Sequence, residues 1–293
     1  MLEVRDAEVV GLHGWIVVEG RVLRDQSWFG DAFETQVGDA WPPDLTPVRL
    51  PGVTLTLVSE WANINYAHLM LDAIPRLDLF ERSGYSIDKV DTILCPTPIH
   101  GIPRWTQLGL DPSRIVYADP KVTYETETLL APSFPGARFV LSSWAAGFLR
   151  DRLSVPAEGQ HRRLYIPRTT TRLLTNEADV WAILEAHGFE TVDPGTSPRD
   201  ARAAFAAADL VLGAHGAGFA DTVFCPVGTP ILEFIPTDHP FPFYFSSAVA
   251  CGLRHHYLVG ESESHRPPGE IQSSLANFHV ETELLERAIQ RLI

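Results

Sequence analysis

Cysteine is scarce in this 293-residue chain, which contains only Cys95, Cys225 and Cys251. The number is odd and no pair has the C-x-x-C spacing of a zinc or redox motif, so we expect reduced, buried thiols. Long apolar runs are also lacking, since 230–236 and 241–253 fall short of the ~18 residues that span a membrane. The first residues, MLEVRDAEVVGLHG, show no signal-peptide pattern. Together these absences predict a cytoplasmic protein with no transmembrane segment.

Several motifs of metal and nucleophile chemistry are missing. The sequence has no D-x-D, no H-E-x-x-H, no G-x-S-x-G and no P-loop. Its E-x-E pairs fall in segments that we expect to be loops or exposed helices: Glu125 and Glu127, Glu261 and Glu263, Glu281 and Glu283. We therefore expect no dedicated metal site and no cofactor.

Positive charge is in short supply. Lysine and arginine number 23 against 37 aspartates and glutamates, a formal net charge of −14. That balance disfavours nucleic acid as a partner, because nucleic-acid binding requires a basic face. A few placed arginines can still hold a single phosphate group.

The chain alternates strand-like and helix-like segments. Hydrophobic residues make up 45% and charged residues 20%, an ordinary globular composition. Residues 1–23 read as short antiparallel strands, and later segments alternate strand and helix as in βαβ units. The length predicts two domains, which we place at 1–158 and 159–276. Residues 277–293 form an amphipathic helix that could pack back on the first domain.

A glycine-rich turn follows an apolar strand in GAHGAGFADTVF, residues 213–224. Gly213, Gly216 and Gly218 could let backbone N–H groups face a phosphate at a helix N-terminus. The order G-x-x-G-x-G differs from the G-x-G-x-x-G dinucleotide fingerprint. The structural alternative is a tight turn with glycines for packing and His215 as a core or capping residue. The pattern alone does not separate the two.

Two arginines flank the end of another predicted strand in RRLYIPRTTTRLLTNE. Arg168 ends the strand and Arg172 lies in the loop that follows. Side chains beyond the carboxyl end of a parallel strand point toward the ligand crevice of α/β sheets, and a guanidinium fork suits a diphosphate. The alternative, favoured by the pattern alone, is a pair of surface arginines.

Two further sites carry ionisable groups. His68 and Asp72 are four residues apart on one predicted helix face and could form a general-base pair. Asp72 could equally pair with Arg76, also four residues away. Glu233 lies within a buried strand, where an ionised group is costly unless paired. It could bind ribose hydroxyls, or it could be structural and bonded to backbone.

These segments, in this order, resemble glycosyltransferase family 61. The resemblance covers about residues 53–236 and rests on six motifs: N-x-x-H-x-x-x-D at 65–72, L-Y-I-x-R at 164–168, R-x-x-x-N-E at 172–177, G-F-E-x-V at 188–192, A-D-x-V-x-G-x-H-G-A-G at 208–218, and L-E at 232–233. It adds Asn65, Asn176 and Glu177 as supporting residues. The chain departs from the family pattern at Pro167 and Asp221.

The resemblance implies an α/β, GT-B-like fold, with two Rossmann-like domains facing across a cleft. It also implies an inverting, metal-independent glycosyltransferase that uses a nucleotide sugar, as in polysaccharide biosynthesis. The acceptor would be a glycan, glycolipid or glycoprotein. The donor domain would be the C-terminal one.

The residue patterns and the family resemblance together predict where the donor phosphates bind. The expected groups are the side chains of Arg168, Arg172 and His215 and the backbone of Gly216, Ala217 and Gly218. Glu233 would hold the ribose, and Asp72, or His68 oriented by it, would be the catalytic base. A non-catalytic nucleotide-sugar binding protein on the same fold is the alternative. A Rossmann-type oxidoreductase is disfavoured by the missing dinucleotide fingerprint.

Overall fold

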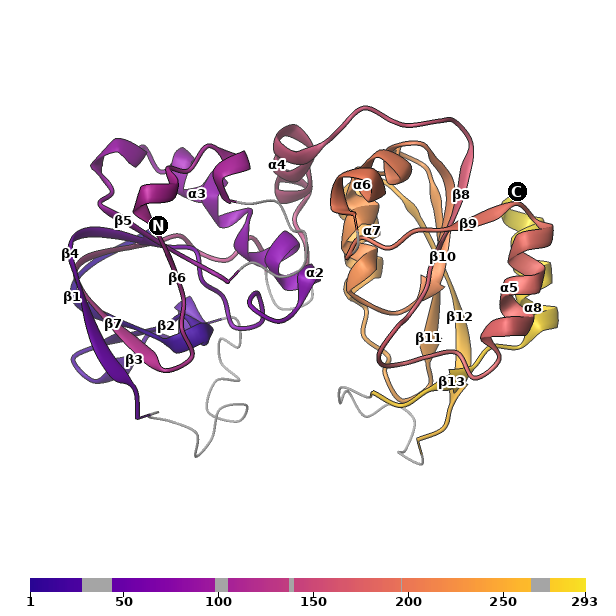
Figure 1. The fold of residues 1–293 in the computed structure, drawn as a ribbon, viewed down its shortest axis with the longest axis horizontal. Coiled ribbons are helices and arrows are strands. Elements are labelled where there is room, and N and C mark those ends of the chain that lie inside the picture. Colours follow the sequence, from indigo (N-terminus) through magenta and orange to yellow (C-terminus); the bar gives the residue numbers. More distant parts are fainter. Residues whose placement is uncertain (28–43, 98–104, 137–139, 196, 265–274) are drawn as a thin grey trace. The chain divides into compact units, whose positions relative to one another are not determined.

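The computed structural model describes residues 1–27, 44–97, 105–136, 140–195, 197–264 and 275–293 (Figure 1). The chain divides into two compact units, Met1–Arg152 and Leu153–Ile293, each with its own β-sheet. Among the helices in these described ranges, none combines the length and the apolar character that crossing a membrane requires.

The first unit is built on a seven-stranded mixed sheet in the order β3-β2-β1-β7-β4-β5-β6. Its strands are β1 (Leu2–Val10), β2 (Trp15–Val18), β3 (Arg21–Val22), β4 (Thr46–Thr56), β5 (Thr92–Cys95), β6 (Ile115–Tyr117) and β7 (Val122–Ala131). Strands β6, β5, β4 and β7 are parallel neighbours, whereas β1, β2 and β3 extend the sheet antiparallel. In chain order the parallel part reads 3-2-1-4, as in half of a Rossmann sheet. The antiparallel strands expected in residues 1–23 are confirmed.

Strand β7 was not expected from the sequence. It lies between β1 and β4, at the centre of the sheet. Glu125 and Glu127 belong to this strand and are exposed, while Tyr124 and Thr126 beside them are buried. The expectation that this E-x-E pair lies in a loop or helix is therefore wrong, because alternation of exposed and buried residues is the pattern of a strand.

The helices of the first unit are short. They are α2 (Tyr66–His68), the π-helical turn η5 (Leu69–Ala73), α3 (Arg76–Arg82) and α4 (Ser143–Leu153) at the boundary between the units. Single 3-10 turns are η1 (Gly11–His13), η2 (Arg24–Gln26), η6 (Ile87–Lys89), η7 (Trp105–Leu108) and η8 (Pro112–Arg114). Buried apolar residues from β1, β4, β5 and β7 form the main core cluster of the sheet.

The second unit is built on a six-stranded sheet in the order β13-β12-β11-β10-β8-β9. Its strands are β8 (Arg162–Ile166), β9 (Phe189–Thr191), β10 (Ala208–Ala214), β11 (Pro230–Pro236), β12 (Arg254–Ser262) and β13 (Phe278–His279). All neighbouring strands are parallel except the β12–β13 pair. In chain order the parallel strands read 2-1-3-4-5, a doubly wound order in which the chain reverses direction across the sheet between the first and third strands. Here those strands are β8 and β10.

Helices cover both faces of the second sheet (Figure 1). On one side lie α6 (Pro198–Ala206), the 3-10 helix η9 (Ala217–Phe224) and α7 (Phe243–Cys251), and on the other lie α5 (Glu177–Ala186) and α8 (Thr282–Leu292). Leu285 and Ile289 of α8 are buried with Val180 and Leu184 of α5. The sequence led us to expect residues 277–293 to pack back on the first unit. The structure differs, because the apolar face of α8 is part of the core of the second unit.

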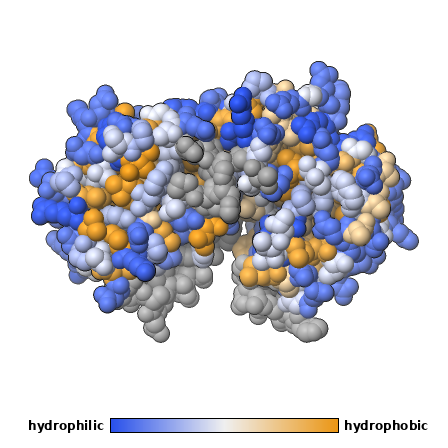
Figure 2. Space-filling model, viewed as in Figure 1, coloured by the Kyte–Doolittle hydropathy of each residue, from blue (hydrophilic) through white to orange (hydrophobic). Residues whose placement is uncertain are grey.

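The α/β class is confirmed in both units. The three cysteines are buried and none of them forms a disulfide. Hydrophilic residues cover most of the visible surface, interrupted by smaller hydrophobic patches (Figure 2), as is usual for globular proteins.

Candidate functional site

The second unit gathers its candidate ligand-binding residues at the carboxyl ends of β8 and β10. Arg168 follows β8, and His215 and Gly216 follow β10. The two strands are direct neighbours, with Ile166 paired to Gly213. Ligands of doubly wound sheets bind at this reversal of strand order. The sequence placed these residues on separate motifs, and the structure brings them to one edge of the sheet.

Both arginines turn back over this edge. Arg168 donates from Nε to the carbonyl of Thr171 at 3.0 Å and from Nη2 to its hydroxyl at 2.8 Å. Arg172 donates from Nε to the carbonyl of His215 at 3.2 Å. Burial lowers the pKa of Arg168, and burial together with the charge of Arg168 lowers the pKa of Arg172 to about 10. These are not two freely solvated surface arginines.

The loop that carries Arg172 is fixed by a distant segment of the chain. Arg172 donates from its N–H to Leu275 at 3.2 Å, and Phe278 donates to Leu173 at 3.1 Å. The side chain of Asn277 accepts from the N–H of Leu173 at 3.1 Å. Arg172 itself has a left-handed backbone, with φ of 53°. Backbone pairing therefore holds an unfavourable conformation in place.

The glycine turn brings the backbone against Arg168. A Cβ at Gly216 would lie 2.1 Å from Nη1 of Arg168, and one at Gly218 would lie 2.7 Å from Cγ2 of Ile166. A side chain at Gly218 would collide with Ile166 in the core, whereas one at Gly216 would displace the end of the Arg168 side chain. The helix that follows, expected over 219–224, is the 3-10 helix η9, which begins at Ala217. The first N–H groups of η9 lie at this edge of the sheet. The N–H groups in the first turn of a helix have no acceptor within the helix and can donate to an anion.

His215 is held by a buried carboxylate. Its Nδ1 hydrogen-bonds Glu233, and Nε2 of His255 lies 2.8 Å from the other oxygen of the same carboxylate. Burial alone would raise the pKa of Glu233, but His215 and His255 reverse the effect and lower it. Because a carboxylate only accepts, both histidines donate to it.

Glu233 is only 1% exposed, and both of its oxygens are occupied by histidines. This geometry does not support the expected role in binding ribose. It assigns Glu233 to orienting His215. His255 was missed in the sequence because it lies on a different strand, and only the register of β11 and β12 places it beside Glu233.

A second histidine lies beside His215. The rings of His239 and His215 are 4.8 Å apart in an edge-to-face arrangement. Burial, followed by the charges of His215 and Arg172, lowers the pKa of His239 to about 3. His239 is therefore neutral at pH 7, and the shift reports a positive potential at this edge of the sheet. No sequence motif pointed to it.

Asn176 and Glu177, expected as supporting residues, both make hydrogen bonds to other segments of the second unit. Asn176 does not cap α5 with its side chain; it instead donates to the carbonyl of Val280 at 2.8 Å and accepts from the Val280 N–H at 3.2 Å. Glu177 accepts from the hydroxyl of Tyr165 at 2.6 Å. These three hydrogen bonds fix the start of α5 to Tyr165 of β8 and to Val280, which precedes α8.

In the first unit, His68 and Asp72 form the expected pair. His68 Nδ1 and Asp72 Oδ2 are 2.6 Å apart, and both side chains are largely buried. Asn65 begins the helix, since its side chain accepts from the N–H of Ala67 at 2.9 Å. Asp72 lies in the π-helical turn η5, which begins directly after His68 and ends at Ala73, two residues before Pro75. Such turns occur often at functional sites.

Comparison with known families identifies the chain. The family model Glycosyltransferase 61 matches residues 66–232, more than half of its length. The chain belongs to glycosyltransferase family 61. It is therefore an enzyme, a glycosyltransferase that uses a nucleotide-sugar donor. Neither the non-catalytic alternative nor the oxidoreductase is retained.

The matched region of this family 61 enzyme includes both the His68–Asp72 pair and the edge formed by β8 and β10. A search of curated proteins found none that matches it. Among solved structures it is similar to the dodecameric iron-containing heptosyltransferase TibC in complex with ADP-D-β-D-heptose, with 11% identity and a TM-score of 0.36. That similarity covers 78% of this chain and 68% of the other. No conclusion rests on a likeness this distant.

Within the described ranges, no group of three or more His, Cys, Asp or Glu side chains is arranged to hold a metal ion.

Proposed function

We propose that this family 61 enzyme is an inverting, metal-independent glycosyltransferase whose donor diphosphate binds at the anion site. We define the anion site as Arg168, Arg172, His215 and the first turn of η9. The proposal pairs this site with His68 of the first unit as the base for an acceptor hydroxyl. The acceptor is a glycan or glycoconjugate, and the reaction takes place in the cytoplasm.

The observation that carries the proposal is the gathering of cationic groups at the switch between β8 and β10. Among the described residues, no carboxylate lies within salt-bridge distance of Arg168. Burial, and then repulsion by the charge of Arg168, lower the pKa of Arg172 to about 10. A bound anion would relieve this repulsion, and guanidinium groups bind phosphate oxygens through paired hydrogen bonds.

His215 contributes through the carboxylate behind it. Glu233 accepts from Nδ1 of His215, which leaves Nε2 on the side away from the carboxylate contact, and an imidazole ring that carries a proton on both nitrogens is a cation. Its Nε2 can donate to a phosphate oxygen. Glu233 is a positioning residue in this scheme, as the carboxylate is in other Asp–His and Glu–His pairs.

The base is assigned by the same reasoning. With Nδ1 of His68 directed at Asp72, a proton taken from the acceptor would go to Nε2, the other ring nitrogen. We assign His68 as the base and Asp72 as the residue that fixes its tautomer. This assignment is one of the two that the sequence left open.

The proposed reaction is a single displacement. The acceptor oxygen forms a bond to the anomeric carbon while the bond from that carbon to the phosphate oxygen breaks. The bonding electrons leave with the nucleoside diphosphate, and the acceptor proton passes to His68. Arg168, Arg172 and His215 stabilise the charge that develops on the leaving phosphate. They would supply the positive charge that a divalent cation provides in other transferases, and the sequence offers no D-x-D motif to bind one.

The anion site is tested by removing one guanidinium. Wild-type enzyme and Arg168→Ala would be titrated calorimetrically with UDP, GDP, ADP and CDP in the presence of EDTA. We expect at least one diphosphate to bind the wild type. Loss of a charge-assisted hydrogen bond should weaken that binding by more than about 1.5 kcal/mol, roughly tenfold.

Arg254→Ala is the matched control, because Arg254 lies at the amino end of β12, away from the anion site, and donates to the carbonyl of Gly228 at 2.9 Å. Its affinity for the diphosphate should equal that of the wild type. Unchanged affinity in Arg168→Ala would overturn the assignment of the anion site.

A further inference from the structure

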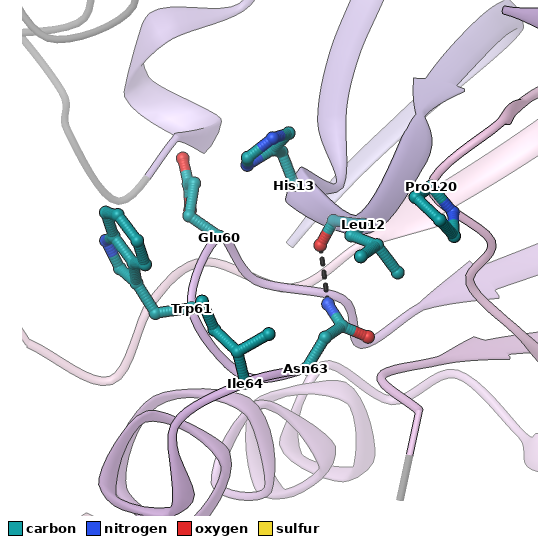
Figure 3. Close-up of a pocket in the computed structure, with 7 residues that line it drawn as sticks. All are labelled: Leu12, His13, Glu60, Trp61, Asn63, Ile64 and Pro120. Carbon is teal, nitrogen blue, oxygen red and sulfur yellow. Dashed lines mark hydrogen bonds between the residues drawn. The ribbon is translucent and has the colours of Figure 1, made fainter. Parts of the chain in front are cut away.

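A pocket of about 110 Å³ lies in the first unit, formed by residues from three separate segments. Leu12 and His13 come from η1, the segment Glu60–Ile64 precedes α2, and Pro120 connects β6 to β7. Figure 3 shows Trp61 and Glu60 on one side of the pocket, with His13 and Leu12 opposite. The volume holds several water molecules. None of the proposed catalytic residues lines this pocket.

Hydrogen bonds hold the pocket in shape. Asn63 donates from its side chain to the carbonyl of Leu12 at 2.6 Å, and its amide oxygen accepts from the N–H of Thr97 at 2.7 Å. The bond to Leu12 is drawn in Figure 3. The ring of His13 stacks on that of Trp15 with centroids 4.2 Å apart. The walls are therefore positioned before any ligand binds, which reduces the entropy cost of binding.

The surface of the pocket combines an apolar mouth with polar groups. Trp61 is 36% exposed and Ile64 is 68% exposed. Partial burial lowers the pKa of His13, so at pH 7 its neutral ring offers one donor and one acceptor. A ligand that suits this surface has an apolar face for the indole ring and hydroxyl groups at its edge. A pyranose has both.

Charge distinguishes this pocket from the anion site. The described residues that line it include a carboxylate, Glu60, and neither lysine nor arginine. Arg76 interacts with Glu60 by charge but does not line the pocket, so a nucleoside diphosphate would meet this carboxylate without a direct cationic contact. The lining thus favours an uncharged ligand.

The pocket also lies beside the proposed base. The rings of Trp61 and His68 are 6.3 Å apart, and Trp61 precedes α2 by only a few residues. A sugar ring packed on Trp61 would have hydroxyl groups within reach of His68.

We propose that this pocket, the Trp61 pocket, binds an uncharged pyranose ring of the acceptor and positions its hydroxyl at His68. This inference rests on the proposed function, because it assumes that the acceptor is bound by the first unit. It names the acceptor class as a saccharide with an uncharged sugar at the reacting end.

The test uses saturation-transfer NMR on the full chain, with the methyl glycosides of glucose, galactose, mannose, xylose and N-acetylglucosamine at millimolar concentration. We expect at least one glycoside to receive saturation at its ring protons from the wild type. Trp61→Ala should reduce the transfer at least fivefold, whereas Trp61→Phe, which keeps an aromatic face, should retain part of it. Tyr85→Ala is the matched control, because Tyr85 is an equally exposed aromatic residue of the same unit outside the pocket.

Ile64→Asp is a second variant at a more exposed position, and it should also abolish the transfer. If no glycoside receives saturation, or if both pocket variants behave as wild type, the Trp61 pocket is not a sugar site. Diphosphate titration separates this failure from failure of the anion site, because Trp61→Ala should bind nucleoside diphosphate as tightly as the wild type. A folded Trp61→Ala protein that loses diphosphate affinity instead would place the nucleobase on Trp61 and overturn the proposal.

Discussion

Asp72 has two basic residues within one helical turn, and the structure shows why it pairs with His68. The guanidinium of Arg76 is almost fully buried and donates to the carbonyls of Pro132 and Val58. Burial lowers the pKa of Arg76 to about 10, although Glu60 and Asp72 act in the opposite direction. The backbone carbonyls occupy the arginine, so its interaction with Asp72 is one of charge without a direct ion pair.

At this scale the first prediction concerns catalysis. His68→Ala should lower kcat by at least 100-fold, because it removes the proposed proton acceptor. Asp72→Asn should lower kcat less and change its dependence on pH, since an amide no longer stabilises the protonated ring. Transfer would be measured from the nucleotide sugar whose diphosphate binds in the titration.

Both variants should bind that diphosphate as the wild type does, because the anion site belongs to the second unit. If the pair only stabilised the helix, both variants would melt at lower temperature and keep kcat. Near-wild-type transfer by both would therefore rule out the assignment of the base.

Some residues of the candidate site could be predicted from the sequence and others could not. The anion-site residues and the His68–Asp72 pair could be predicted from motifs. The anion-site residues follow predicted strands, and the pair shares one face of a predicted helix. His255 and His239 could not, because their contacts with Glu233 and His215 depend on strand register and on a loop conformation. The two histidine partners of Glu233 could not be predicted for the same reason.

At the scale of elements, the second unit was the more predictable. Its parallel strands are buried on both faces and read as apolar runs. The alternation of strand and helix expected for βαβ units is present there, with helices between its parallel strands. In the first unit β7 was missed, because ETET at residues 125–128 resembles exposed, charged sequence although the strand is central. The π-helical turn was also missed, since Pro75 predicts a break without specifying its geometry.

The turn between β10 and η9 gives a prediction about Gly216. Its φ of 176° is an extended conformation open to any residue, so only space limits substitution. A methyl group there would meet the end of the Arg168 side chain, which is flexible. Gly216→Ala should therefore fold with a Tm near that of the wild type and bind nucleoside diphosphate at least tenfold more weakly.

Gly218→Ala provides the contrast, because its methyl group would meet Ile166, a buried residue of β8. That variant should lower the Tm as well. Gly147→Ala in α4 is the neutral control, since nothing lies within 4 Å of the added methyl group, and alanine favours a helix over glycine by about 1 kcal/mol. A Gly216→Ala protein with full diphosphate affinity would show that Arg168 does not need its observed position.

At the scale of the whole molecule, each unit contains a parallel core in an order typical of doubly wound sheets. The antiparallel strands β1, β2 and β3 extend only the first. In the proposed function, the second unit binds the donor and the first unit supplies the base for the acceptor. The cationic groups and the His68–Asp72 pair belong to these different units.

A direct displacement predicts the stereochemistry of the product. The new glycosidic bond should have the anomeric configuration opposite to that of the donor, read from the coupling constant of the anomeric proton during the reaction. The rate should be unchanged by EDTA, because arginines and a histidine are proposed to neutralise the leaving group. Retained configuration would refute the single displacement, and inactivation by EDTA that is reversed by a divalent cation would refute metal independence.

The pairing of residues 172–173 with residues 275–278 has a consequence for biosynthesis. Synthesis proceeds from the amino terminus, and domains generally begin to fold while the chain is still growing. Strand β8 and the arginines that follow it are made about a hundred residues before the segment that fixes their loop. A growing chain can therefore assemble most of the second sheet while the arginine loop still lacks its partner. The proposed anion site is therefore completed only after residues 275–278 have been made, when strands β8 to β12 have already been synthesised.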